Sequence, residues 1–152
     1  MPTGHVQLWK GSSFTIERKK GKAPGTVIFH FSGPFTARDM FGSLSPEAMH
    51  NLFESQSDEE PAISIFDLTD VPYMDSSGLG MIISQYVRCQ AKGLRMVAAG
   101  VGPRVLEWFR LTKLDTFIPM DATVDEAEAH ALQLPQPRPL HPDVLRFLGE
   151  GI

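Results

Sequence analysis

The sequence contains a single cysteine, Cys89, so it cannot form an internal disulfide. This usage is typical of a reducing compartment, and the position within a predicted helix favours a packed, unreactive thiol. No apolar run reaches the roughly 18 residues that a membrane-spanning helix needs. Residues 1–10 also lack the apolar core of a secretion signal. We therefore expect a cytoplasmic protein with no direct membrane insertion.

The sequence also lacks an excess of basic residues. It has 14 Lys and Arg against 18 Asp and Glu, which gives a formal net charge of −4. This balance offers neither the basic surface of a nucleic-acid-binding protein nor a polybasic patch for an anionic membrane. The one basic cluster, Arg18, Lys19, Lys20 and Lys22, falls in a predicted turn. A solvated hairpin tip explains it better than a phosphate-binding surface, so no nucleic acid partner is expected.

The sequence patterns of common enzyme sites are missing as well. It has no Gly-x-Ser-x-Gly elbow, no phosphate-binding loop and no dinucleotide-binding glycine pattern. Paired histidines and Cys-x-x-Cys are absent, and none of the five histidines has a clear relation to a candidate nucleophile. The sequence therefore predicts a protein that is not an enzyme, with no catalytic residue, no metal site and no cofactor.

The pattern of apolar residues predicts an α/β fold. The 152 residues fit one domain with one hydrophobic core. Two strands in succession imply an antiparallel hairpin, and the later alternation of strands with helices implies parallel β-α-β units. We expect a mixed sheet of four to five strands with about four helices packed mainly on one face. The predicted strands are 13–18, 26–31, 62–68, 94–99 and 117–120; helices are predicted at 75–92 and 123–132, with two more beginning near residues 45 and 102.

The two ends of the chain differ from the region between them. We divide the sequence into an N-terminal extension at 1–12, a domain at 13–132 and a proline-rich tail at 133–152. Four prolines between residues 135 and 142 predict an extended, semi-rigid segment. The apolar residues at 144–148 either fold back onto the domain, which we favour, or dock on a partner or a second copy of the chain. A homodimer is therefore left open.

A polar junction follows the predicted buried strand at 62–68. Asp75 is well placed as a helix N-cap that accepts from the backbone N–H of Ser77 or Gly78. Ser76 then lies in the first turn with its hydroxyl toward solvent. The lack of side chains at Gly78 and Gly80 predicts that another surface can approach closely. Taken alone, these residues are more often a helix cap and first-turn polar groups.

The flanking segments give this junction a family resemblance. Residues 73–80 read Tyr-Met-Asp-Ser-Ser-Gly-Leu-Gly, residues 66–71 read Phe-Asp-Leu-Thr-Asp-Val, and residues 101–103 read Val-Gly-Pro before another apolar helix pattern. Together with the order of the elements, they resemble the STAS domain of anti-sigma factor antagonists, also called anti-anti-sigma factors. The resemblance covers roughly residues 13–132, and the strand–helix junction is its most specific part.

The resemblance implies a partner-switching role in transcription regulation. In the family, the serine that corresponds to Ser76 is phosphorylated by a partner that is both anti-sigma factor and serine kinase and brings the ATP. The unphosphorylated form binds this partner, and the phosphorylated form releases it. The partner-binding residues implied here are Gly33, Thr36, Asp75, Ser76, Ser77, Gly78, Gly80, Gln85 and Arg88.

One loop departs from the family pattern. The family has an acidic, a hydrophobic and an acidic residue before its first helix, and this chain has Pro34, Phe35 and Thr36. The alternative reading is a STAS scaffold, or the regulatory subunit of a membrane transport system, in which Ser76 is never phosphorylated.

Overall fold

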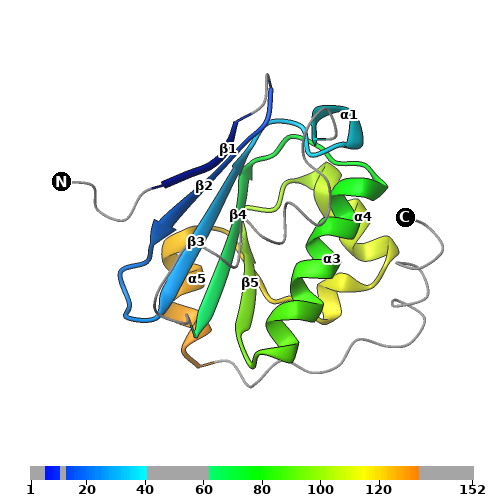
Figure 1. Ribbon diagram of the computed structural model, residues 1–152. Helices are drawn as coiled ribbons and strands as arrows, with labels where there is room; N and C mark the ends of the chain where they lie inside the picture. The colour runs from blue at the N-terminus through cyan, green and yellow to red at the C-terminus, as the bar shows by residue number, and fades with distance from the viewer. Residues whose placement is uncertain (1–5, 11–12, 41–61, 134–152) are drawn as a thin grey trace.

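The computed structural model describes residues 6–10, 13–40 and 62–133 (Figure 1). These residues form one six-stranded sheet in the order β1-β2-β3-β4-β5-β6. This described part also contains four α-helices. The strands are β1 (Val6–Lys10), β2 (Thr15–Lys20), β3 (Thr26–Ser32), β4 (Ile63–Asp70), β5 (Arg95–Ala99) and β6 (Met120–Asp121), and the helices are α1 (Ala37–Met40), α3 (Ser76–Ala91), α4 (Pro103–Leu111) and α5 (Val124–Ala131), with a 3-10 turn η1 (Leu114–Thr116).

The pairing of the strands confirms the predicted mixed sheet. Strands β1, β2 and β3 are antiparallel, and β3 to β6 are parallel. The sheet has one strand more than the predicted four to five because residues 6–10, which we placed in an N-terminal extension, pair with β2. The β1–β2 register shifts between Gln7 and Trp9. A bulge of this kind interrupts the two-residue alternation that would have marked the strand in the sequence.

Helices cover both faces of the sheet, with most of them on one face, as predicted. Alternate residues of β3 point to opposite faces of the sheet, and most residues on both faces are buried. This burial explains the nearly continuous apolar sequence of the strand. The larger core lies beneath α1, α3 and α4, and α5 packs on the opposite face (Figure 1). The smaller core under α5 consists of Ile28, Ile63, Ile65, Val97, Ala99, Ala127 and Ala131.

One predicted strand is shifted in the structure, and one predicted helix and the tail lie outside the described residues. The strand predicted at 117–120 is shifted: a 3-10 turn lets Phe117 N donate to Leu114 O at 2.9 Å, and β6 begins only at Met120. Pro119 has no N–H and takes part through its carbonyl, which accepts from Ala98 N at 2.9 Å. The predicted helix near residue 45 and the tail beyond residue 133 lie outside the described residues.

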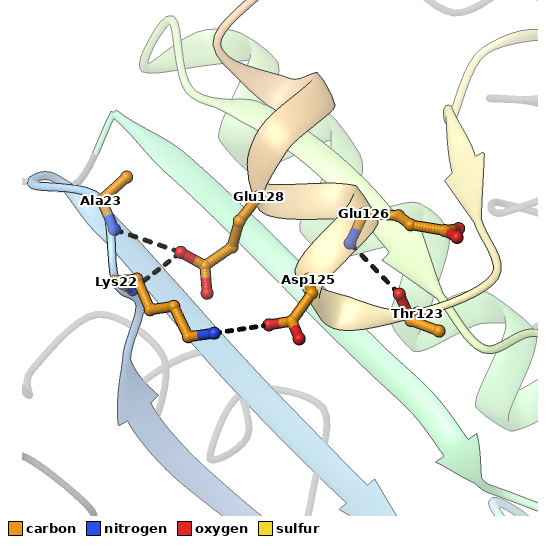
Figure 2. A network of polar contacts seen from close by, with 6 residues as sticks. All are labelled: Lys22, Ala23, Thr123, Asp125, Glu126 and Glu128. Carbon is orange, nitrogen blue, oxygen red and sulfur yellow. Dashed lines mark hydrogen bonds and ion pairs between the residues drawn. The ribbon is translucent and has the colours of Figure 1, made fainter.

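The turn between β2 and β3 is attached to α5 by a buried carboxylate (Figure 2). Glu128 is only 7% exposed, and one of its oxygens accepts from Lys22 N at 2.7 Å and from Ala23 N at 3.1 Å. Lys22 Nζ also lies 3.1 Å from Asp125, but both of those side chains are largely exposed, so this ion pair contributes little.

Arg18 does not belong to the solvated hairpin tip that we expected, because its side chain is buried. This burial lowers the pKa of its guanidinium.

We expect Glu128→Ala to lower the free energy of unfolding by about 1–3 kcal/mol, because two backbone N–H groups lose their acceptor. Glu126→Ala is the matched control. Glu126 lies on the same helix, its side chain points away from the turn in Figure 2, and the loss of its charge near the helix N-terminus should cost less than about 1 kcal/mol. Urea unfolding of the two variants makes the comparison, and equal losses would show that the Glu128 contact is unimportant.

Candidate functional site

The candidate site lies where β3 and β4 end side by side. Because these strands are parallel, the segments that follow them leave the same edge of the sheet. Gly33 N donates to Asp70 O at 2.9 Å, and Phe35 N donates to Tyr73 O at 3.0 Å. A parallel bridge between Phe35 and Met74 continues the pairing beyond the strands. The two loops are therefore held together by backbone hydrogen bonds.

Asp75 joins both loops to the start of α3. One carboxylate oxygen accepts from Ser77 N at 2.9 Å and Gly78 N at 3.1 Å, which confirms the predicted N-cap. The other oxygen accepts from Ala37 N at 3.0 Å, at the start of α1. This second contact was missed from the sequence, because it joins segments that are far apart in the chain. A single side chain therefore fixes the position of α1 relative to the N-terminus of α3.

Ser76 and Ser77 occupy the first turn of α3. Both are partly exposed, and within the described part of the chain neither hydroxyl makes a hydrogen bond. The backbone N–H groups of Ser77 and Gly78 are occupied by Asp75. The positive end of the helix dipole lies at this turn, and such a position stabilises a negatively charged group. Ser76 therefore combines a hydroxyl that has no partner among the described residues with a setting that tolerates added negative charge.

The two glycines of the junction do not serve the purpose that we expected. Gly78 and Gly80 are both buried. A Cβ at Gly78 would lie 2.2 Å from Phe35 O and 3.1 Å from Phe35 Cγ, so the space beside it is already filled by the loop before α1. Gly78 allows close packing within the protein, and the prediction that both glycines face a partner is corrected accordingly.

The expected partner-facing residues on α3 are divided between core and surface. Gln85 is 5% exposed, because it follows Ile82 by three residues and precedes Cys89 by four, which places it in the buried stripe of the helix. The sequence spacing already contained this signal, so assigning Gln85 to the surface was an error. Arg88, three residues further on, is exposed and lies on the surface of α3.

The first turn of α1, which directly follows the loop at residues 33–36, contains an acidic residue that was missed from the sequence, Asp39. Gly33 has a φ of +99°, and a Cβ there would lie 1.8 Å from Ser13 O. Thr36 is partly exposed, and its hydroxyl donates to Asp39 at 2.5 Å and accepts from Asp39 N at 3.3 Å. Ser13 Oγ donates to the other Asp39 oxygen at 2.5 Å.

Asp39 places a fixed negative charge in the first turn of α1, next to the loop at residues 33–36. Hydrogen bonds from Ser13 and from Thr36 hold the pKa of its carboxyl below the ordinary value. The sequence pattern that could have predicted the Thr36–Asp39 contact is Thr-x-x-Asp, which is close to a capping box at a helix start. The uncharged residues at 34–36 are therefore followed by a carboxylate that the fold directs back onto Thr36.

Helix α4 supports the segment that leads to Ser76. Trp108 Nε1 donates to Met74 O at 2.8 Å, and the Arg104 guanidinium carbon lies 4.6 Å from the centre of the Tyr73 ring. Neither contact was foreseen, because no short-range pattern links residues 73–74 with residues 104–108. Segments on three sides, the loop before α1, α3 and α4, thus hold residues 73–76 in place.

Comparison with known proteins places this fold and this junction in a family. The model of the STAS domain family matches residues 18–127. The chain belongs to the STAS domain family. The anti-sigma-B factor antagonist of Listeria monocytogenes is 30% identical to it over 84 residues, which are 55% of this chain and 73% of that protein.

Solved structures share the STAS fold at lower identity. A sulfate transporter family protein from Wolinella succinogenes is 21% identical with a TM-score of 0.62, over 76% of this chain and 91% of the other. The unphosphorylated form of the Bacillus anti-sigma factor antagonist SpoIIAA is 18% identical with a TM-score of 0.60, over 81% of this chain and 99% of the other.

Cysteine and potential metal ligands give no second site within the described residues of this STAS domain. Cys89 is buried, and burial raises the pKa of its thiol to about 12, so it stays protonated and packed, as predicted. In residues 6–10, 13–40 and 62–133, no three His, Cys, Asp or Glu side chains are grouped so that they could hold a metal ion. No helix in those ranges is both long and apolar enough to cross a bilayer.

Proposed function

We propose that this STAS domain is an anti-sigma factor antagonist, and that phosphorylation of Ser76 controls its binding to an anti-sigma factor that is also a serine kinase. The observation that carries the proposal is the Asp75-capped first turn of α3, which presents a partly exposed serine whose hydroxyl has no partner among the described residues. The name of the 30% identical Listeria relative supports the same role.

The chemistry at Ser76 belongs to the partner. The kinase brings ATP, the Ser76 Oγ–H bond is replaced by an Oγ–P bond, the γ-phosphorus separates from ADP, and the proton passes to the kinase or to solvent. The protein itself catalyses nothing in this scheme and acts in the cytoplasm, where sigma factors meet RNA polymerase. Its contribution is a rigid, accessible serine on a surface that the partner recognises.

Release of the partner follows from charge. A phosphoserine adds roughly −1.5 to −2 charge, and the helix N-terminus tolerates it. The added charge lies next to Asp75, on a surface that already carries the fixed negative charge of Asp39. Binding is lost through repulsion and steric clash in the interface while the domain stays folded.

The proposed surface is smaller than the one inferred from the sequence. It comprises Gly33, Pro34, Thr36, Asp75, Ser76, Ser77 and the exposed Arg88. It leaves out Gly78, Gly80 and Gln85, because all three are buried. Asp39 joins the surface through its contacts with Thr36 and Ser13.

The second candidate is a STAS scaffold or transporter regulatory subunit that is never phosphorylated. The uncharged residues Pro34, Phe35 and Thr36 favour it, because the resembled family carries acidic groups there. The two candidates differ in whether Ser76 is phosphorylated and in how partner binding responds to negative charge at Ser76.

We expect Ser76→Asp to weaken binding to the cognate anti-sigma kinase by about tenfold or more, which corresponds to 1.4 kcal/mol, with an unchanged melting temperature. An acidic residue in the first turn of a helix does not destabilise it. Ser76→Ala, which adds no charge, should bind like the wild type. Calorimetric titration against the anti-sigma kinases of the same genome measures both variants. Equal affinity of Ser76→Asp and wild type would reject the switch and favour the scaffold.

A further inference from the structure

Two residues of α4 are attached to the segment immediately before Ser76. Arg104 and Trp108 are four residues apart and therefore lie on the same side of the helix. Trp108 Nε1 donates to Met74 O at 2.8 Å, and Arg104 stacks over the ring of Tyr73 with 4.6 Å from Cζ to the ring centre. Helices α3 and α4 cover the same core on one face of the sheet (Figure 1). The start of α4 is thus part of the same surface as the serine.

The guanidinium of Arg104 has N–H donors that form no hydrogen bond within the described residues. Arg104 is exposed, and within the part of the chain that the structure describes its side chain makes no hydrogen bond or ion pair. A guanidinium carries five N–H donors in one plane. A cation stacked on an aromatic face is held by the ring while its edge stays free to bind. Tyr73 therefore orients Arg104 without using its hydrogen-bonding capacity.

This pair lies close to Ser76. Tyr73 precedes Ser76 by three residues, so their Cα atoms are separated by at most about 11 Å. Arginine and tyrosine are among the residue types that most often dominate the affinity of a protein–protein interface. An arginine plane with free edge donors matches the geometry of a carboxylate, which it binds through two parallel hydrogen bonds.

We propose that Arg104, held over the ring of Tyr73, binds a carboxylate side chain of the anti-sigma partner in the same interface as Ser76. This inference rests on the proposed function and names a recognition residue for it. It also adds a second cause of release. The partner's carboxylate would lie on the same surface as the phosphate of a modified Ser76, and the two anions repel each other.

The test measures the affinity of the full chain for the anti-sigma kinases of its genome at low and high salt. Arg104→Gln keeps a planar group over Tyr73 but removes the charge, and we expect it to weaken binding about tenfold at low salt and to flatten the salt dependence. Arg104→Lys keeps the charge without the paired donors and should fall between Arg104→Gln and wild type. Arg110→Gln is the matched control, since Arg110 is exposed on the same helix away from Tyr73. It should bind within twofold of wild type.

The possible results separate this inference from the proposed function. Loss of affinity in Ser76→Asp with wild-type affinity and salt dependence in Arg104→Gln would overturn the role of Arg104 alone. A lower melting temperature of Arg104→Gln with an unchanged salt dependence of binding would show that Arg104 and Tyr73 make only a packing contact. This result would also overturn the role of Arg104 in binding. If the wild-type protein bound none of the kinases, the proposed function itself would be refuted.

Discussion

Gly78→Ala is expected to destabilise the domain by about 2–3 kcal/mol, although replacing glycine by alanine inside a helix normally stabilises a protein by about 1 kcal/mol. The sign reverses because the new methyl group would lie 2.2 Å from Phe35 O. Phe35 is fully buried, and its carbonyl accepts from Asp75 N at 3.3 Å, so backbone rather than a flexible side chain would have to move. Urea unfolding measures the loss.

Gly102→Ala provides the comparison for Gly78→Ala. A Cβ at Gly102 has no atom within 4 Å, and its φ of −78° is open to any residue. We expect a change of less than about 1 kcal/mol, from the weaker capping preference of alanine. If Gly78→Ala matched Gly102→Ala or stabilised the protein, the close packing of the α1 loop against α3 would be refuted.

Asp75→Ala is expected to cost about 2–3 kcal/mol, because it removes a helix cap and an acceptor for a distant loop together. The side chain accepts from Ser77 N, Gly78 N and Ala37 N. Asp75→Asn separates the two roles. The amide oxygen can still cap α3, but the amide nitrogen then faces Ala37 N–H and cannot accept from it. This variant should keep more stability than Asp75→Ala while loosening the loop before α1.

Thr123→Ala is the control for Asp75→Ala. Thr123 caps α5 through a bond from Glu126 N to its hydroxyl at 3.1 Å, and its side chain bonds no distant loop among the described residues. Its loss should cost about 1 kcal/mol. Thermal unfolding compares the variants, and hydrogen exchange at Ala37 reports on the bridge directly. Equal losses in Asp75→Ala and Thr123→Ala, with protection of Ala37 unchanged, would contradict the bridging role.

The sequence predicted most of the fold because local signals and tertiary packing agree in it. The hairpin of β2 and β3, the alternation that follows it and the cap at Asp75 all rest on short-range patterns that the structure confirms. Strand β1 was missed because a bulge breaks its alternation, and β6 was displaced because a 3-10 turn precedes it. Both errors lie at the edges of the sheet, where the fewest contacts constrain the pattern.

The site was predicted less completely, because its contacts join distant segments. Asp75 could be recognised as a cap, but its bond to Ala37 and the packing of Gly78 on Phe35 depend on tertiary structure. The support of Met74 by Trp108 also lay beyond any local pattern. Gln85 is different, since its spacing from Ile82 and Cys89 would have placed it in the core.

The most direct test of the central claim is to incubate the protein with the anti-sigma kinases of its genome and ATP, and to map phosphate by mass spectrometry. We predict phosphate on Ser76, none on the Ser76→Ala variant, and dissociation of the complex as the phosphate accumulates. Binding that persists with every kinase tested, without phosphate on Ser76, would contradict the switch. It would indicate that this domain, with its uncharged residues 34–36, acts as a scaffold.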